Sequence, residues 1–326
     1  MTWPLPRIHI VTPYLAQSNN GNWRTAKRWA DMLSVKCRTA VRQAWEGEAC
    51  DLIIALHARR SAPSIHAWAN AGKPMPLALC LTGTDLYNDL ESDVTAQRSV
   101  DLADRLIVLQ EDALRHVPIR CRVKTQVIHQ SSPTLRPARK PANRLDCVMV
   151  GHVRAEKDPL TVVRALKMLP PELPVKVQHI GAALDSALMS ALVAEANTEP
   201  RYRHVGPLPH GLARAAIKRA HLLLHPSLLE GGANVIVEAL TAGTSVLASE
   251  MSGNIGMLGR PYPGYFPVGD ASALSALLRK ALVDASFRAE LANACRARAP
   301  LFSPAEEQRR LEVLVFGLLG DSLAVR

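Results

Sequence analysis

Short apolar runs recur along the chain, and helical patterns separate several of them. The runs are nearly continuous rather than alternating, which is typical of strands buried on both faces of a parallel sheet. We expect strands at Ile8–Thr12, Leu52–His57, Leu77–Leu81, Leu106–Leu109, Gln126–His129, Cys147–Gly151, Val177–Gly181, Leu222–His225 and Val246–Ser249. Helical spacing of apolar residues is clearest in Trp23–Leu33 and Thr161–Leu169. Strands that alternate with helices predict an α/β fold with parallel sheets wound on both faces.

A proline-rich segment interrupts this alternation near the middle of the chain. Residues 131–144 contain Pro133, Pro137 and Pro141 and have no apolar period, so we interpret them as a linker. We therefore expect an N-terminal α/β domain at residues 1–130 and a second α/β domain at residues 145–302. The last segment, residues 303–326, opens with Ser303-Pro304, a helix-start signal, and is expected to be a helix that packs back.

Composition and charge narrow the classes of function. Hydrophobic residues make up 48% of the 326 residues, which excludes a mostly disordered chain. Aromatic residues are only 4%, which argues against the stacking platforms that bind single-stranded nucleic acid. The net charge is +10, and residues 1–144 carry +8 of it, so the first half should attract anions.

The cysteines and the apolar runs indicate the compartment. Six cysteines are present and no two form a Cys-x-x-Cys pair, which is the pattern of a reduced, cytoplasmic protein without a zinc site. No apolar run approaches the ~18 residues that span a bilayer. We expect a cytoplasmic protein with no membrane insertion.

A glycine-containing turn follows the predicted strand at Leu222–His225 and leads into a predicted helix near Asn234. The sequence there is His225-Pro-Ser-Leu-Leu-Glu-Gly-Gly-Ala-Asn-Val-Ile-Val-Glu238. Glycines let a ligand approach the backbone, and free N–H groups at a helix start bind anions. Glu230 stands beside the glycines, and Glu238 lies about one turn into the helix, within reach of sugar or ribose hydroxyls. An ordinary strand–turn–helix with Asn234 as its cap fits the same residues.

Two cations follow the predicted strand at Cys147–Gly151. Arg154 and Lys157 are three residues apart and precede a predicted helix that Asp158 caps and Pro159 begins. Positive side chains at the carboxyl end of a strand suit a diphosphate. A solvated basic turn is the alternative reading.

Three loops of the first half place polar and basic residues directly after predicted strands. The carboxyl ends of parallel strands meet at one edge of a sheet, so these side chains should converge there. The set favours a small anion over an apolar acceptor such as a lipid. The candidate acceptor-binding residues are Asn20, Gly21, Asn22, Arg24, His57, Arg59, Arg60, Thr82 and Asp85.

Glu230 and Glu238, together with Arg154 and Lys157, resemble the signature of the GT-B glycosyltransferases of the family-4 type. The resemblance covers most of residues 145–260. It implies an α/β GT-B fold, in which two Rossmann-like doubly wound parallel-sheet domains face each other across a cleft. It also implies that Arg154 and Lys157 hold the donor diphosphate, that Glu230 contacts sugar and phosphate during catalysis, and that Glu238 binds ribose. The implied donor-binding residues are Gly206, Leu208, Glu230, Gly231, Gly232, Ala233, Asn234, Val235 and Glu238. Positive groups and a helix start stabilise the leaving nucleoside diphosphate, so no metal is expected.

Four strings resemble a narrower family, the selenosugar synthases of selenoneine biosynthesis. They are Asn20-Gly-Asn-Trp-Arg-Thr-Ala, Ala55-Leu-His-Ala-Arg-Arg-Ser-Ala, Leu81-Thr-Gly-Thr-Asp-Leu-Tyr and Val127-Ile-His-Gln-Ser. The resemblance implies formation of a C1–Se bond from selenophosphate and UDP-N-acetylglucosamine or UDP-glucose, with release of UDP and phosphate. It implies no cofactor beyond these substrates, and a functional link to a selenophosphate-producing enzyme and a downstream selenoneine synthase. His57, with Arg59 and Arg60, would hold the phosphate oxygens, and His57 would supply a proton or position water.

Two other interpretations fit parts of the sequence. A family-4-type glycosyltransferase with a conventional glycolipid or polysaccharide acceptor would share the donor motifs. A polyanion or RNA binder would share the positive charge, but the chain shows no RNA-binding motif and few aromatics.

Overall fold

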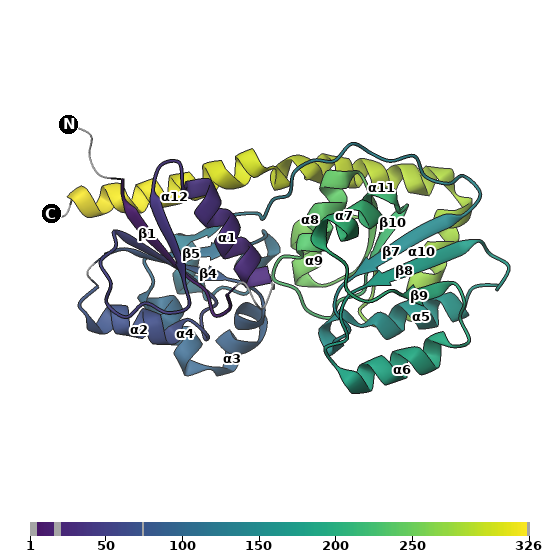
Figure 1. The fold of residues 1–326 in the computed structure, drawn as a ribbon, viewed down its shortest axis with the longest axis horizontal. Helices are drawn as coiled ribbons and strands as arrows, with labels where there is room; N and C mark the ends of the chain where they lie inside the picture. Colours follow the sequence, from purple (N-terminus) through teal and green to yellow (C-terminus); the bar gives the residue numbers. More distant parts are fainter. Residues whose placement is uncertain (1–4, 16–20, 74, 325–326) are drawn as a thin grey trace. The chain divides into compact units, whose positions relative to one another are not determined.

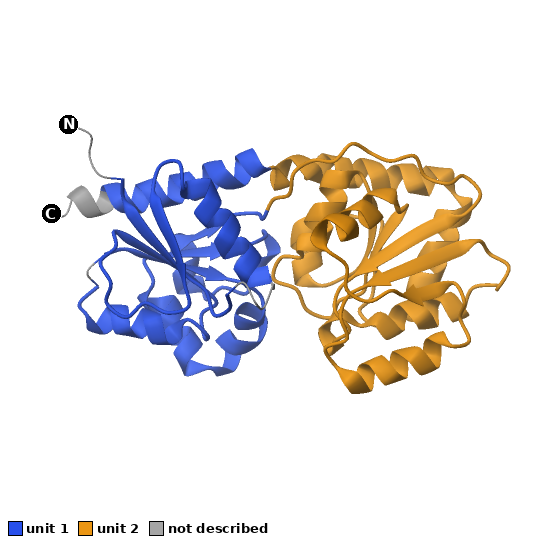
Figure 2. Cartoon of the chain, viewed as in Figure 1, with its two compact units in different colours: residues 1–130, 304–326 blue, residues 131–303 orange. Residues whose placement is uncertain are grey.

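The chain forms two compact units, each built on a six-stranded parallel sheet (Figures 1 and 2). The computed structural model describes residues 5–15, 21–73 and 75–324. Unit 1 comprises residues 1–130 and 304–326, and unit 2 comprises residues 131–303. The structure confirms the predicted α/β class with parallel sheets.

Unit 1 has a sheet with strand order β2-β1-β3-β4-β5-β6. Its strands are β1 (Arg7–Val11), β2 (Arg38–Arg42), β3 (Leu52–Leu56), β4 (Leu77–Leu81), β5 (Arg105–Val108) and β6 (Thr125–Val127). Its helices are α1 (Gly21–Leu33), α2 (Ala62–Asn70), α3 (Leu90–Ser92), α4 (Val94–Leu102) and α12 (Pro304–Ala324).

Helices cover both faces of this sheet, because successive side chains of a strand point to opposite faces. In β3, Leu52, Ile54 and Leu56 belong to the core that α1 and α12 close. Ile53 and Ala55 belong to the core that α2 and α4 close. Both faces being buried explains why the central strands read as continuous apolar runs.

Unit 2 has a sheet with strand order β12-β11-β10-β7-β8-β9. Its strands are β7 (Leu145–Val150), β8 (Val175–Ile180), β9 (Tyr202–His204), β10 (Leu222–His225), β11 (Ser245–Ser249) and β12 (Tyr265–Phe266). Its helices are α5 (Pro159–Lys167), α6 (Ser186–Ala196), α7 (His210–Arg219), α8 (Asn234–Ala242), α9 (Ser252–Leu258), α10 (Ala271–Val283) and α11 (Ala285–Arg298).

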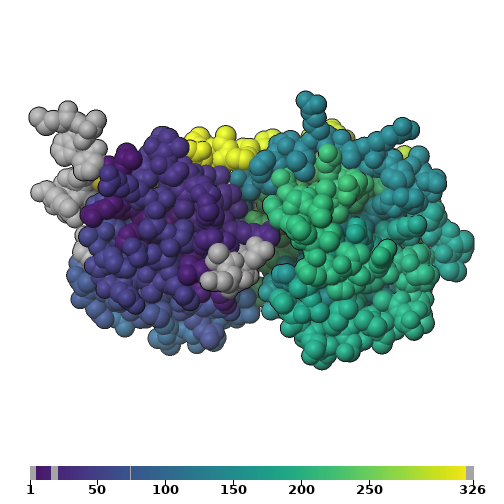
Figure 3. Space-filling view, in the orientation of Figure 1, coloured from purple at the N-terminus to yellow at the C-terminus, as the bar shows by residue number. Residues whose placement is uncertain are grey.

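The chain enters unit 2 through a stretch without regular structure and leaves it through a helix that belongs to unit 1. Residues 131–141 contain no helix or strand, and Leu135 donates its N–H to Thr241 O at 2.9 Å, which ties this stretch to α8. After residue 303 the chain returns to unit 1, where α12 buries Leu311, Leu314 and Val315. The yellow end of the chain lies beside the purple residues of unit 1 in the space-filling view (Figure 3). In the described part of the chain, no helix combines the length and apolarity needed to cross a membrane.

Candidate functional site

The ends of β7 and β10 bring Lys157 and Glu230 together in unit 2. The Lys157 ammonium donates to Glu230 Oε1, and the two side chains are 14% and 11% exposed. His225, the last residue of β10, places Nε2 3.3 Å from the same oxygen. Burial alone would raise the pKa of the Glu230 carboxyl, but Lys157 and His225 hold it well below its usual range. Glu230 is therefore a carboxylate at neutral pH, with a cation already beside it.

Arg154 is the more exposed of the two predicted phosphate-binding cations. Its side chain is 46% exposed, and Nε lies 3.8 Å from Glu156 Oε2. Asp158 caps α5 as the sequence predicts, accepting from the Thr161 hydroxyl at 2.6 Å, and Pro159 begins the helix. The loop after β7 therefore holds Lys157 inward and leaves Arg154 accessible.

The start of α8 lies directly after Glu230 and the glycine pair. Ala233 stands at the N-cap and Asn234 is the first helical residue, so the expected alternative of Asn234 as a side-chain cap is wrong. Among the described residues, no side chain caps this helix. Uncapped N–H groups at a helix start form a site for an anion. Gly231 and Gly232 lie in the turn before this helix, and Val235 lies in its first turn.

Glu238 lies one turn further into α8 and pairs with a residue that the sequence analysis missed. The Glu238 side chain is 9% exposed, and His210 Nε2 lies 2.7 Å from its Oε1. His210 is the first residue of α7 and follows the turn that contains Gly206 and Leu208. Gly206 has a φ of +74°, a conformation that favours glycine. The predicted base-binding turn and the predicted ribose ligand are thus joined through His210.

In unit 1, Asp85 organises two loops rather than facing solvent. Its carboxylate has no exposed surface and accepts backbone N–H bonds from Ala58 at 2.9 Å, Thr82 at 2.9 Å and Gly83 at 2.8 Å. These bonds join the loop after β3 to the loop after β4. Because its oxygens are already occupied, Asp85 shapes the loops that carry the other candidates.

His57 sits inside the same arrangement. Its side chain is 3% exposed, its φ is +76°, and its Nδ1 accepts from Arg60 N at 3.3 Å. Since Nδ1 accepts, Nε2 carries the hydrogen and donates to Thr84 Oγ1 at 3.0 Å. His57 is therefore held in one orientation, and Thr84 is a second residue that the sequence analysis did not single out.

The two adjacent arginines have different surroundings. Arg59 bonds to Asp89 Oδ1 at 3.1 Å and lies 3.2 Å from Asp93 Oδ2, so carboxylates already balance its charge. Arg60 donates to the Tyr14 hydroxyl, and its guanidinium carbon lies 5.1 Å from the centre of the Tyr14 ring. Arg60 is the better placed of the two to meet an anion.

The remaining predicted acceptor residues lie at the start of α1. Gly21, Asn22 and Arg24 form the first turn of this helix, whereas Asn20 lies outside the described residues. Thr25 on the same turn donates to Gly21 O at 3.0 Å and accepts from Gln130 Nε2.

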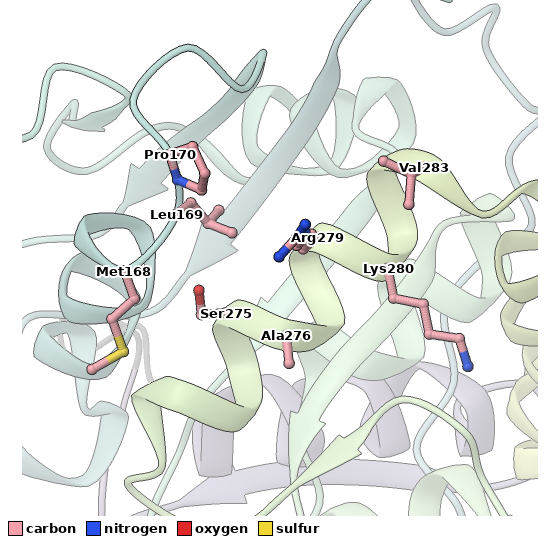
Figure 4. A pocket seen from close by; sticks show the side chains of 8 residues that line it. All are labelled: Met168, Leu169, Pro170, Ser275, Ala276, Arg279, Lys280 and Val283. Atoms are coloured by element: carbon pink, nitrogen blue, oxygen red, sulfur yellow. The ribbon is translucent and has the colours of Figure 1, made fainter.

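A separate groove of about 360 Å³ lies in unit 2 between the end of α5 and α10 (Figure 4). Met168, Leu169 and Pro170 line one side, and Ser275, Ala276, Arg279, Lys280 and Val283 line the other. None of these residues belongs to the predicted site. Within the described ranges, no group of three or more His, Cys, Asp or Glu residues is arranged to hold a metal ion.

Comparison with protein families identifies a match over more than half of the chain. The family model of the group 1 glycosyl transferases matches residues 133–299, which include Arg154, Lys157, Glu230 and Glu238. Comparison with curated protein sequences finds no match.

Solved structures match almost the whole chain. Anabaena HepE, in complex with UDP and glucose, has a TM-score of 0.76 at 16% identity, over 96% of this chain and 100% of that chain. Sucrose-phosphate synthase from Thermosynechococcus elongatus has a TM-score of 0.77 at 17% identity, over 97% and 100%. A glycosyltransferase from Rickettsia africae has a TM-score of 0.74 at 13% identity, over 97% and 99%. At these identities the likeness shows the fold, which is GT-B.

Proposed function

Because this chain belongs to the group 1 glycosyl transferases, we propose that it is a selenosugar synthase that joins selenophosphate to the sugar of UDP-N-acetylglucosamine or UDP-glucose. HepE, with the same fold, binds UDP and UDP-glucose. The observation that carries the donor half is the Lys157–Glu230 pair beside the uncapped start of α8. The acceptor half rests on the resemblance of the loops after β1, β3 and β4 to that family.

The donor would bind to unit 2. Arg154, Lys157 and the N–H groups at the start of α8 would neutralise the diphosphate as the bond from C1 to its oxygen breaks. Glu238, oriented by His210, would accept hydrogen bonds from the ribose hydroxyls. Glu230 keeps Lys157 in place before the donor arrives, so its first effect would be to set the position of that ammonium.

Selenophosphate would meet the loops of unit 1. We assign Arg60, rather than Arg59, to its phosphate oxygens, because two aspartates already bind Arg59. The selenium attacks C1 and the C1–O bond breaks, which releases UDP. Water then cleaves the Se–P bond and yields phosphate and the selenol. His57, with its Nε2 hydrogen on Thr84, is the candidate to position that water or supply the proton.

The deciding experiment measures UDP release from each UDP-sugar, with and without selenophosphate, together with the mass of the product. We expect UDP release that depends on selenophosphate and a sugar product that contains selenium. UDP release with a conventional acceptor and none with selenophosphate would assign the enzyme to ordinary glycosyl transfer.

Two variants test the proposed donor-binding and acceptor-binding residues separately. Arg154→Ala should raise the KM for the UDP-sugar and lower kcat, because each lost charged hydrogen bond contributes about 1.5–3 kcal/mol, or about 10- to 100-fold. Arg60→Ala should raise the KM for selenophosphate and leave UDP affinity unchanged. Equal loss of UDP affinity in both variants would contradict the division.

A further inference from the structure

The ends of β8 and β9 share a His-x-Gly pattern, and the proposed reaction assigns no role to either histidine. His179 and Ile180 end β8 and Gly181 follows them, whereas His204 ends β9, the neighbouring strand, and Val205-Gly206 follows it. Gly151 stands at the corresponding end of β7, the next strand along.

Each histidine bonds to the glycine of the preceding strand. His179 Nε2 lies 2.9 Å from Gly151 O, and His204 Nε2 lies 2.8 Å from Gly181 O. Backbone bonds run the other way, from Gly151 N to Ile180 O at 2.9 Å and from Gly181 N to Gly206 O at 3.0 Å. Both polar backbone groups of Gly151 and Gly181 are therefore fixed by the adjacent strand.

The hydrogen positions on His179 follow from its partners. A carbonyl only accepts, so His179 Nε2 must donate to Gly151 O, and Nδ1 accepts from the Tyr202 hydroxyl at 2.6 Å. The ring has no exposed surface. Burial, together with the nearby His204 and His152, lowers the pKa of His179 to about 4. The ring is thus neutral, with both nitrogens bonded.

The glycines make this approach possible. A Cβ on Gly181 would lie 1.8 Å from Gly151 O and 3.0 Å from His152 Cα, so any side chain would displace the loop after β7. The carbonyl of Gly151 is therefore enclosed between the His179 ring and the Gly181 backbone. This loop continues to Arg154 and Lys157, and the Lys157 side chain packs 3.4 Å from the position of a Cβ on Gly151.

We propose that His179 and His204 are positioning residues that fix the loop bearing Arg154 and Lys157 for the donor diphosphate. The role of that loop rests on the proposed function. The hydrogen bonds of His179 and His204 do not depend on the proposed function. Neither histidine needs to contact the donor.

The test compares His179→Leu and His204→Leu with His179→Gln, whose Nε2 can still donate to Gly151 O. Hydrogen exchange of residues 151–157 and the Kd for UDP are measured in each. We expect exchange about tenfold faster and UDP binding about tenfold weaker in the leucine variants, the effect of one lost buried hydrogen bond. His179→Gln should restore most of both.

The matched control is His221→Leu. His221 makes the same kinds of bond, from Nε2 to Pro141 O at 3.0 Å and from Asp146 N to Nδ1 at 3.0 Å, at the opposite ends of β7 and β10. His221→Leu should leave both the hydrogen exchange of residues 151–157 and the Kd for UDP at the wild-type level. Unchanged exchange in both leucine variants, or an equal change in His221→Leu, would overturn the proposal.

The test also distinguishes a variant that does not fold from a failure of the proposed function. If His179→Leu fails to fold, the half-buried His204 carries the same comparison. If the wild-type protein does not bind UDP, the proposed function fails, and exchange of residues 151–157 still decides whether the histidines fix the loop.

Discussion

The buried imidazole of His179 makes stability depend on pH. Burial, with His204 and His152 nearby, lowers its pKa to about 4 in the folded protein, against 6.5 for a free histidine. Between these values the unfolded chain binds the extra proton, so stability falls as pH decreases from about 6.5 to 4. The loss from this residue amounts to about 3 kcal/mol.

Urea unfolding at pH 7, 5.5 and 4 checks this prediction. His179→Gln should lose less stability than the wild type over that interval, because glutamine does not titrate there. Other histidines contribute equally to both proteins. The same decrease in both would contradict the assignment.

Asp85 shows where residue patterns stop being informative. Its place after a strand, in a loop with threonines and a glycine, predicted contact with an anionic acceptor. The structure instead uses its carboxylate for three backbone N–H groups. Capping of a loop and binding of a ligand require the same residue types, and only the position of the neighbouring backbone distinguishes them. His210 and Thr84 were missed for the related reason that their partners lie on distant segments.

Among the secondary-structure elements, α9 supports the Glu230 loop through a glycine. A Cβ on Gly253 would lie 2.0 Å from Glu230 O and 3.0 Å from Glu230 Cβ. Gly253→Ala should therefore displace Glu230, lower stability by about 1–3 kcal/mol and raise the KM for the UDP-sugar. Thermal unfolding and steady-state kinetics measure the two effects.

Gly211→Ala in α7 is the control for this change, because a Cβ there meets nothing within 4 Å. It should keep both Tm and KM near the wild-type values. Kinetics of Gly253→Ala that match those of the control would show that Glu230 does not depend on this contact.

The strands that the sequence patterns miss are three of the four edge strands of the two sheets. The nine predicted runs match strands of the two sheets, because burial on both faces leaves a continuous apolar signal. The patterns missed β2, β9 and β12, which lie at sheet edges, whereas the fourth edge strand, β6, was predicted. β2 is Arg-Thr-Ala-Val-Arg with no fully buried residue, and β12 has only two residues. An edge strand packs on fewer neighbours, so its sequence is less constrained.

On the scale of the whole molecule, Glu307 secures α12 to unit 1. Its buried carboxylate accepts from Arg28 Nε at 2.8 Å and from Trp29 Nε1 at 2.8 Å. Glu307→Ala leaves the arginine and the indole without their acceptor and should lower the free energy of unfolding by about 3 kcal/mol.

Glu306→Ala is the matched control, since its bonds to Arg309 and Arg310 lie within one helix and nearer to solvent. It should cost less than about 1 kcal/mol. Urea unfolding followed by circular dichroism compares the two, and equal losses would show that Glu307 does not hold α12 in place.

The return of α12 to unit 1 also sets an order for folding during synthesis. Residues 131–303 form a continuous unit and can fold as soon as they leave the ribosome. Unit 1 cannot complete its core at that stage, because Leu311, Leu314, Val315 and Leu318 close one face of its sheet and are translated after residue 303. One face of the N-terminal sheet therefore stays incompletely covered while residues 131–303 fold. A nascent-chain chaperone would accordingly find its binding surface on the first unit synthesised rather than on the second.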